Sequence, residues 1–385
     1  MNLIYFDNAA TSWPKPEETY TAMDRYSRMT GGSPGRSGHR LSIEAGRIIL
    51  DTREAIARLL GINDLFQIIF TMNATQALNL AVFGLLSSGD HVITSSMEHN
   101  SVMRPLRALE ERGVEISVIT CSPRGELDPQ DVLDAIKNNT KAIYLTHASN
   151  VTGTIMPIRE VGKITRDHGL TFCIDAAQTA GVLPLNIDES NIDLLAFTGH
   201  KSLYGPQGTG GLYIRKSLEK EMQPLMVGGT GSRSEFETQP DFMPDKYECG
   251  TPNGIGLAGL GAGVDFILVN GMSAIRAKEK ALTQYFLDGL KPIQGVTIYS
   301  PGDAARQISI VSFNIAGVLP SEASLAFDEQ FGIMSRPGLH CAPSAHRTIG
   351  TFPGGTVRFS FGYFNTEDEI NQALAAVRQL SRQGR

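Results

Sequence analysis

Cysteine is scarce in this sequence. The 385 residues contain only Cys121, Cys173, Cys249 and Cys341. They show neither CxxC spacing nor the density of a disulfide scaffold, so they argue against both a disulfide framework and a cysteine-rich metal site. This usage predicts a reducing, cytoplasmic location, in which a functional cysteine would act as a thiol.

The sequence also lacks an excess of positive charge and a long apolar run. Lys and Arg number 34 against 40 Asp and Glu, a formal net charge of −6, which argues against nucleic acid or anionic lipid as a partner. The apolar stretch 254–271 is rich in glycine and interrupted by Asp265, so we expect no membrane span. Residues 1–7 have no charged and apolar leader pattern, and we expect no export signal.

Short apolar runs alternate with helical patterns from about residue 45 to 215. The runs are apolar throughout, as in strands that are covered on both faces of a sheet. The predicted strands are 67–71, 91–95, 114–120, 141–146, 170–174, 194–198 and 211–214, and the predicted helices include 45–60, 75–86 and 157–168. This order predicts an α/β fold with a large, doubly wound, mainly parallel sheet.

The pattern changes after about residue 257. Two helices (257–269 and 273–290) precede predicted strands at 296–299, 307–314 and 356–360, and a helix at 366–382 has Asn365 or Thr366 as its candidate N-cap. We therefore expect a smaller α+β domain, formed by 257–385 together with the N-terminal segment 1–14, beside a large domain of 15–256.

Polar residues follow three of the predicted strands where each strand ends. DAAQ stands at 175–178, TGHK at 198–201 and TMNAT at 71–75, where a helix begins. Ligands of doubly wound sheets bind beyond the carboxyl ends of the strands. The sequence therefore predicts a ligand site at this edge of the sheet.

Lys201 and Asp175 indicate the chemistry of that site. Taken alone, Lys201 would be a solvated loop charge and Asp175 a helix N-cap. One strand apart, they suit pyridoxal phosphate (PLP), which needs a lysine to carry it and a carboxylate that keeps its ring nitrogen protonated.

A phosphate site is predicted at the head of the helix that begins near Ala74. Ala74 and Thr75 combine backbone amides at a helix start with a hydroxyl donor, although an ordinary threonine cap would look the same. Thr198 and His200 could reach the same phosphate, and His99 could stack on the cofactor ring. Each of these histidines could instead be a packed or surface residue.

Motifs spread over nearly the whole chain resemble one enzyme family. They are YFDNAAT (5–11), MEH (97–99), SNVTGT (149–154), DAAQ (175–178), TGHKSLYGP (198–206), ECGTPN (248–253), RPGLHCAP (336–343) and Arg358. Together and in this order they resemble the cysteine desulfurases and selenocysteine lyases, NifS-like and of the short-loop group II, within the class V aminotransferase group. The resemblance implies the PLP-dependent transferase fold type I.

The resemblance also implies roles for individual residues. Lys201 would carry PLP as a Schiff base, with Asp175 at the ring nitrogen, Gln178 at the phenolic oxygen and His99 stacked on the ring, where it could move protons. Asn150 would lie near that oxygen or the substrate carboxylate. Thr75, Thr198 and His200 would bind the phosphate. Gly250 and Thr251 would reach the phosphate of a neighbouring subunit, so a homodimer is expected. Arg358, which alone would be read as a structural ion-paired residue, would hold the substrate carboxylate.

Cys341 distinguishes among the reactions of this group. A free cysteine is most often a small buried hydrophobe, but this one lies in a loop-like segment next to His340, and Arg336 is near in sequence. The resemblance implies that Cys341 takes sulfur from L-cysteine as a persulfide, leaving L-alanine, and passes it to a protein acceptor in a pathway such as iron–sulfur cluster assembly.

Three alternatives remain at this point: a selenocysteine lyase acting on L-selenocysteine, another class V aminotransferase or lyase, and a non-catalytic scaffold of the same fold. The loop also departs from the family pattern, which usually reads RTGHHC. Here Pro337 stiffens the loop entry and Leu339 removes a polar side chain, which bears on substrate preference and acceptor docking. The segment 31–39 is richer in glycine than the family leads us to expect.

Overall fold

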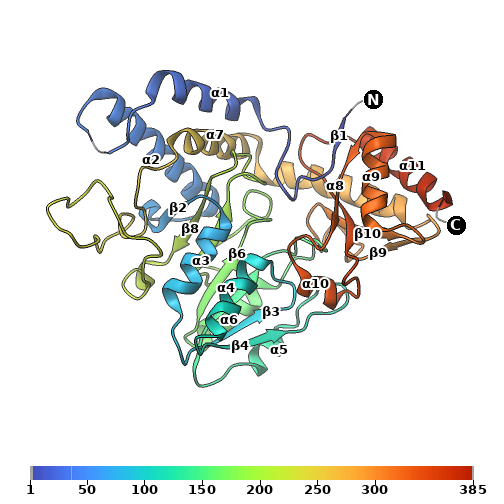
Figure 1. The fold of residues 1–385 in the computed structure, drawn as a ribbon, viewed down its shortest axis with the longest axis horizontal. Coiled ribbons are helices and arrows are strands. Elements are labelled where there is room, and N and C mark those ends of the chain that lie inside the picture. Colours follow the sequence, from blue (N-terminus) through green and yellow to red (C-terminus); the bar gives the residue numbers. More distant parts are fainter. Residues whose placement is uncertain (1–2, 36, 384–385) are drawn as a thin grey trace.

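A seven-stranded sheet forms the centre of the computed structural model, which describes residues 3–35 and 37–383 (Figure 1). The strands lie in the order β2 (Ile68–Thr71), β8 (Gly210–Ile214), β7 (Leu194–Thr198), β6 (Thr171–Asp175), β5 (Thr140–Thr146), β3 (His91–Ser95) and β4 (Glu115–Ile119). The strands from β7 to β4 are parallel, and β8 runs antiparallel to both of its neighbours. The expected α/β fold with a mainly parallel sheet is confirmed.

Each face of this sheet is covered by its own hydrophobic core. On β5, Ile143 and Leu145 belong to one core, whereas Ala142 and Tyr144 belong to the other. Successive side chains of a strand point to opposite faces, so a strand that is buried on both sides must be apolar throughout. The covering helices are α2 (Arg40–Leu60), α3 (Ala74–Leu85), α4 (Asn100–Glu110), α5 (Pro129–Asp134), α6 (Ile158–Asp167) and α7 (Gly254–Asn270).

A second, four-stranded sheet lies in the C-terminal part of the chain (Figure 1). Its antiparallel order is β12 (Arg336–Gly338), β13 (Thr356–Ser360), β10 (Ile310–Ile315) and β9 (Val296–Ile298). Its core includes clustered phenylalanines, among them Phe286, Phe313 and Phe359. The helices here are α8 (Met272–Leu290), α9 (Pro320–Phe331), α10 (Pro343–Thr348) and α11 (Glu367–Gln383).

The N-terminal segment joins this second unit. Strand β1 (Ile4–Tyr5) pairs in parallel with β11 (Ile333–Met334), and Phe6 lies in the same core as the phenylalanines of the second sheet. The chain then continues into α1 (Glu17–Arg25) and a π-helical turn (Tyr26–Thr30) that ends at Gly31. Short 3₁₀ turns occupy Leu65–Gln67 and Lys216–Leu218. Between β1 and α1, residues 7–12 pass the carboxyl edge of the large sheet, where the Ser12 amide donates to the His200 carbonyl at 3.0 Å.

Most predicted boundaries hold to within a few residues; one strand begins later than expected, and the structure decides between the two candidate caps of α11. Strand β10 begins at Ile310 rather than 307, since Gln307 forms an isolated bridge with Thr154 instead. The cap of α11 is Thr366: its Oγ1 accepts from the amide of Glu369 at 3.3 Å, and the Glu369 carboxylate accepts from the Thr366 amide at 2.9 Å.

In residues 3–35 and 37–383, no single helix is long and apolar enough to cross a membrane. Helices α7 and α8 reach the required length and hydropathy only when counted together, and they are bent by 84° relative to each other. In the glycine-rich segment 31–39, Arg36 lies outside the described residues. Gly32 there packs closely on the backbone of Leu41, where a side chain would meet the carbonyl carbon at 2.8 Å.

Candidate active site

A cavity of about 250 Å³ lies at the carboxyl ends of β5, β6 and β7. Its lining includes Ala74, Thr75, His99, Asn150, Asp175, Gln178, Thr198, His200, Lys201 and Arg358. Ala9, Ala10, Asn73, Ser101, Thr146, Ala177, Arg336 and His340 complete it. All the residues that the sequence assigned to one subunit's cofactor and carboxylate site are therefore brought together here. Cys341 lies in an adjoining groove.

Lys201 and Asp175 are two ionisable side chains of opposite charge type that line the cavity. Burial lowers the pKa of Lys201 to about 8, and the charge of Asp175 partly opposes this. Burial likewise raises the pKa of Asp175, while its hydrogen bond from the Ala177 amide at 2.9 Å and the charge of Lys201 oppose the rise. A lysine amine with a pKa near 8 is neutral in about a tenth of molecules at pH 7, far more than an ordinary lysine, and the neutral amine is the nucleophile.

His99 is held in one orientation by the start of α4. Its Nδ1 accepts from the backbone amide of Ser101 at 3.0 Å and lies 2.9 Å from the Ser101 hydroxyl. Since Nδ1 accepts the amide proton, the proton of the neutral ring is on Nε2. Burial, with the nearby charges of Lys201 and Arg336 adding to it, lowers the pKa of His99 to about 4. His99 is therefore a neutral imidazole near neutral pH.

The start of α3 forms one wall of the cavity. The Asn73 side chain caps this helix by accepting from the Gln76 amide at 3.0 Å, which leaves the amides of Ala74 and Thr75 at the open end. The Thr75 hydroxyl lies 2.7 Å from that of Ser101. These groups suit an anion, because the amides and the helix dipole both favour negative charge there.

His200 supplies a second observation at this wall. Among the described residues, its buried Nδ1 has no hydrogen-bond partner. Burial lowers the pKa of His200 to about 4, so the ring is neutral. A buried polar atom of this kind costs free energy unless a ligand or water satisfies it, which is consistent with a polar ligand at this point.

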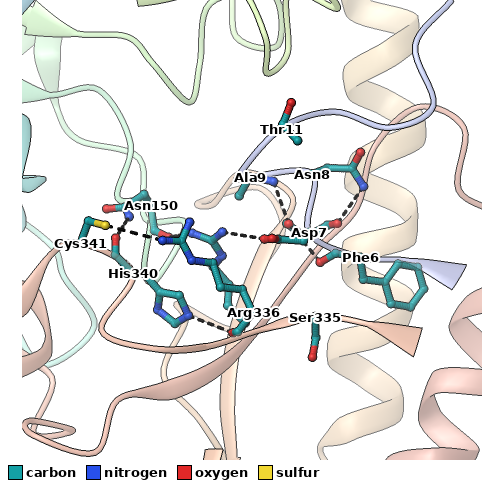
Figure 2. Close-up of polar contacts among 12 residues, drawn as sticks. Phe6, Asp7, Asn8, Ala9, Thr11, Asn150, Ser335, Arg336, His340 and Cys341 are labelled. Carbon is teal, nitrogen blue, oxygen red and sulfur yellow. Dashed lines mark hydrogen bonds and ion pairs between the residues drawn. The ribbon is translucent and has the colours of Figure 1, made fainter. Parts of the chain in front are cut away.

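Arg358 lies on β13, with its side chain only 1% exposed. Its guanidinium donates to Asp7 Oδ1 at 2.9 Å and to the Asn150 carbonyl at 2.9 Å, while its Nε has no partner among the described residues. Figure 2 shows Asp7 on the N-terminal segment, close to Asn150 and Arg336. The guanidinium is thus fixed by its neighbours and lines the cavity.

Cys341 is exposed and lies beside Arg336, whose Nη2 is 3.5 Å from the thiol sulfur (Figure 2). His340 and Cys341 both have left-handed backbones, with φ of 50° and 59°, a conformation that costs about 1–2 kcal/mol per non-glycine residue. Two hydrogen bonds hold the carbonyls of this turn. The side-chain amide of Asn150 donates to the His340 carbonyl at 2.6 Å, and the backbone amide of Asn100 donates to the Cys341 carbonyl at 2.8 Å.

The groove next to Cys341 adjoins the cavity and shares part of its lining. It has a volume of about 470 Å³, and Thr75, His99 and Ser101 line both spaces. The thiol is therefore accessible. Pro337, which the family pattern lacks, lies in edge strand β12, where a residue without an amide proton is tolerated.

Gly250 and Thr251 are not part of the cavity of this chain. Both are exposed, and the Gly250 amide donates to the Gly229 carbonyl at 2.8 Å. Their predicted role in a neighbouring subunit stays a prediction. Conversely, the sequence reasoning gave no role to Asp7 or Ser101. Asp7 belongs to a motif that was recognised, YFDNAAT, and that was the one available signal.

The residues present fit PLP. A cavity of about 150 Å³ holds a benzene ring, so this one accommodates a substituted ring. It offers an amine at Lys201, a carboxylate at Asp175, and at one wall an anion-binding helix start next to the unpartnered Nδ1 of His200. In the described part of the chain, no group of three or more His, Cys, Asp or Glu side chains could hold a metal ion.

Comparisons with known proteins agree with this reading. Residues 4–373 match the family model described as aminotransferase class-V. A probable cysteine desulfurase of Methanothermobacter thermautotrophicus is 34% identical over 99% of this chain and 95% of its own length, and one of Halobacterium salinarum is 36% identical over 98% and 91%. The apo structure of a cysteine desulfurase from Thermococcus onnurineus superimposes with a TM-score of 0.92 at 34% identity, covering 99% of this chain and 95% of the other.

Proposed function

The chain belongs to the aminotransferase class-V family, and from this premise we propose that it is a cysteine desulfurase that converts L-cysteine to L-alanine and takes the sulfur onto Cys341. One observation carries the proposal. The exposed Cys341 thiol stands in a groove that shares Thr75, His99 and Ser101 with the Lys201 cavity. A transaminase has no need for a thiol at this place.

The proposed cofactor is PLP. Lys201 would hold it covalently, Asp175 would pair with its ring nitrogen, and Gln178 would lie at its phenolic oxygen. Ala74, Thr75, Thr198 and His200 would bind its phosphate, and His99 would stack on its ring. When bound, PLP supplies an electron sink that makes the α-proton of an amino acid acidic.

The substrate carboxylate would be held by Arg358, next to Asn150. Because Asp7 and the Asn150 carbonyl already fix the guanidinium, little freedom is lost when it binds a carboxylate. Lys201, with a pKa near 8, can accept the α-proton as a free amine. His99, as a neutral ring with its proton on Nε2, offers a donor rather than a second positive charge.

Sulfur transfer would be the work of Cys341. Its thiolate attacks the sulfur of the bound cysteine, a sulfur–sulfur bond forms and the carbon–sulfur bond breaks. The electron pair of the broken bond stays on the substrate carbon, which takes up a proton. The overall change is cysteine plus thiol to alanine plus persulfide, so no external oxidant or reductant is needed. A thiol of an acceptor protein would then discharge the persulfide in the cytoplasm.

We also propose a homodimer as the active form. The support is the position of Gly250 and Thr251, which are exposed and away from the cavity of their own chain although the family motif assigns them to a phosphate. A partner's copy would bring them to the site.

The test is alanine formation from L-cysteine by the wild type, Lys201→Ala and Cys341→Ala, in the presence of a reductant. The wild type should release alanine and sulfide in equal amounts, and both variants should lose at least about 100-fold of that rate. L-Selenocysteine serves as the second substrate of the assay. Because selenium leaves carbon more readily than sulfur does, Cys341→Ala should retain more activity on selenocysteine than on cysteine. A Cys341→Ala variant that desulfurates cysteine at the wild-type rate would contradict the proposal.

A further inference from the structure

Two buried histidines lie in series beneath the turn that presents Cys341. His340 Nε2 is 3.0 Å from the Arg336 carbonyl, and His340 Nδ1 is 3.3 Å from Nε2 of His346 on α10. His346 Nδ1 is in turn 2.7 Å from the Thr351 hydroxyl. The side chain of His346 is completely buried, and its ring lies 5.4 Å from that of His340 between centroids.

The Arg336 carbonyl determines which group donates in each hydrogen bond of the series from Thr351 through His346 and His340 to Arg336. The Arg336 carbonyl can only accept, so His340 Nε2 carries a proton. Burial lowers the pKa of His340 well below its usual value and that of His346 to about 4, so both rings are neutral and each has one proton. His340 Nδ1 must therefore accept from His346 Nε2, and His346 Nδ1 must accept from Thr351.

The chain of hydrogen bonds ends on the backbone that determines where the thiol stands. His340 and Cys341 both have left-handed backbones, and Arg336 supplies both the last acceptor and the guanidinium beside the thiol. The carbonyls of His340 and Cys341 are already bonded to Asn150 and Asn100. Residues 336–338 of the turn are also paired with β13, and the His340 ring adds a buried side-chain attachment between this strand and Cys341.

We propose that His346 is a positioning residue for sulfur transfer: through His340, and oriented by Thr351, it holds the Arg336–Cys341 turn so that the thiol faces the bound substrate. The inference rests on the proposed function, because it concerns the step assigned to Cys341. It extends that function by adding two residues, His346 and Thr351, that contact neither the cavity nor the thiol.

The test uses a graded set of variants. His346→Leu removes both hydrogen bonds, whereas His346→Gln keeps an amide donor that can reach His340 Nδ1. Thr351→Val removes only the hydroxyl. The matched control is His91→Leu. This histidine is also fully buried, and its ring nitrogens are bonded to the hydroxyls of Thr140 at 2.7 Å and Ser117 at 2.9 Å. It lies at the first residue of β3, at the end of the strand opposite to the active-site edge.

Two substrates separate positioning from general damage. β-Chloro-L-alanine loses chloride without a nucleophile on its leaving group, so it reports cofactor chemistry alone, whereas L-cysteine needs the thiol. His346→Leu should lower kcat for cysteine by about 10- to 100-fold, since a misplacement near 1 Å can cost that much, with KM unchanged. Its elimination of chloride should stay within about threefold of wild type, because the turn contributes Arg336 and His340 to the cavity wall but none of the residues assigned to the cofactor or the substrate carboxylate.

A readout without turnover completes the test. The rate of Cys341 alkylation by iodoacetamide, with Cys341→Ala as background, should fall by about 10-fold in His346→Leu, because the thiol leaves its place beside Arg336. His346→Gln should restore most of the wild-type rate, and Thr351→Val should lie between them. His91→Leu should match the wild type in alkylation and in the ratio of the two activities.

The outcomes separate cleanly. Loss of both activities in parallel in His346→Leu would overturn the inference in favour of a general structural role, and so would cysteine turnover and alkylation at wild-type rates. Both results leave the proposed function standing, provided the wild type makes alanine and Cys341→Ala does not. If Cys341→Ala makes alanine at the wild-type rate, the proposed function itself fails.

Discussion

Asp7→Asn is the substitution with the clearest predicted effect on stability. Asp7 is the carboxylate partner of Arg358, which is the largest of the fully buried side chains. The asparagine is isosteric, so the change removes a charge and leaves the shape of the site. The guanidinium cannot escape by losing its proton, because arginine stays charged in proteins.

The magnitude follows from burial. Removing one partner of a buried ion pair costs about 3–5 kcal/mol, since the other charge is left without compensation. The Asp7 side chain is 21% exposed, and Arg358 keeps its bond to the Asn150 carbonyl. The loss should therefore be toward the lower end, about 2–4 kcal/mol.

Urea unfolding of the apo-protein, followed by circular dichroism, measures this loss. The matched control is Glu110→Gln, which removes the ion pair between Glu110 and Arg107. This pair is closer, at 2.7 Å, but the side chains of Arg107 and Glu110 are 50% and 44% exposed. Exposed pairs contribute below about 1 kcal/mol, so the control should unfold almost as the wild type does. An Asp7→Asn protein with the wild-type midpoint would refute the reasoning, since the longer pair would then contribute no more than the exposed one.

The remaining predictions concern the proposed cofactor site. Lys201→Ala should lose the visible absorbance of bound PLP while its circular dichroism stays that of the wild type; a borohydride-fixed cofactor on another lysine would contradict the assignment. Asp175→Asn should still bind PLP but lose about 100-fold or more in α-proton exchange, because an unprotonated ring is a poor electron sink; exchange measured by NMR at the normal rate would count against it. Since burial lowers the pKa of Lys201 to about 8, attachment of PLP to the apo-protein should accelerate between about pH 7 and pH 9 and then level off, as stopped-flow absorbance would show; a rate that keeps rising above pH 9 would indicate an unperturbed amine, and a rate independent of pH an amine that is already neutral. Light scattering should give a dimer, and Thr251→Ala should weaken PLP binding in equilibrium dialysis; a fully active monomer would exclude the shared site.

The large sheet could be predicted because its strands are buried on both faces. Strands β3 and β7 have the bounds expected from their apolar runs, His91–Ser95 and Leu194–Thr198. The short strands β1, β11 and β12 were not predicted. Each has two or three residues, which is too short to show a period. Strands β1 and β11 pair only because the N-terminal segment reaches the C-terminal part of the chain, and β12 is defined by its pairing with β13.

The residues of the site likewise fall into those that the sequence could predict and those that it could not. Lys201, Asp175 and Thr75 follow strands, so their convergence could be expected from topology alone. Asp7 could not be assigned a role, because its partner Arg358 lies 351 residues away and the pair exists only after folding. His346 carried no signal either, since its contact with His340 depends on a backbone turn that the residue types do not reveal.

The central claim, that Cys341 receives sulfur from cysteine, is tested most directly by intact-mass measurement after one turnover without reductant. The wild type should gain the mass of a single sulfur atom, and peptide mapping should locate it on Cys341. The Cys341→Ala variant, which should retain bound PLP, should gain none. An unmodified wild type that has nevertheless formed alanine, or a sulfur atom found on Cys249 instead, would contradict the account.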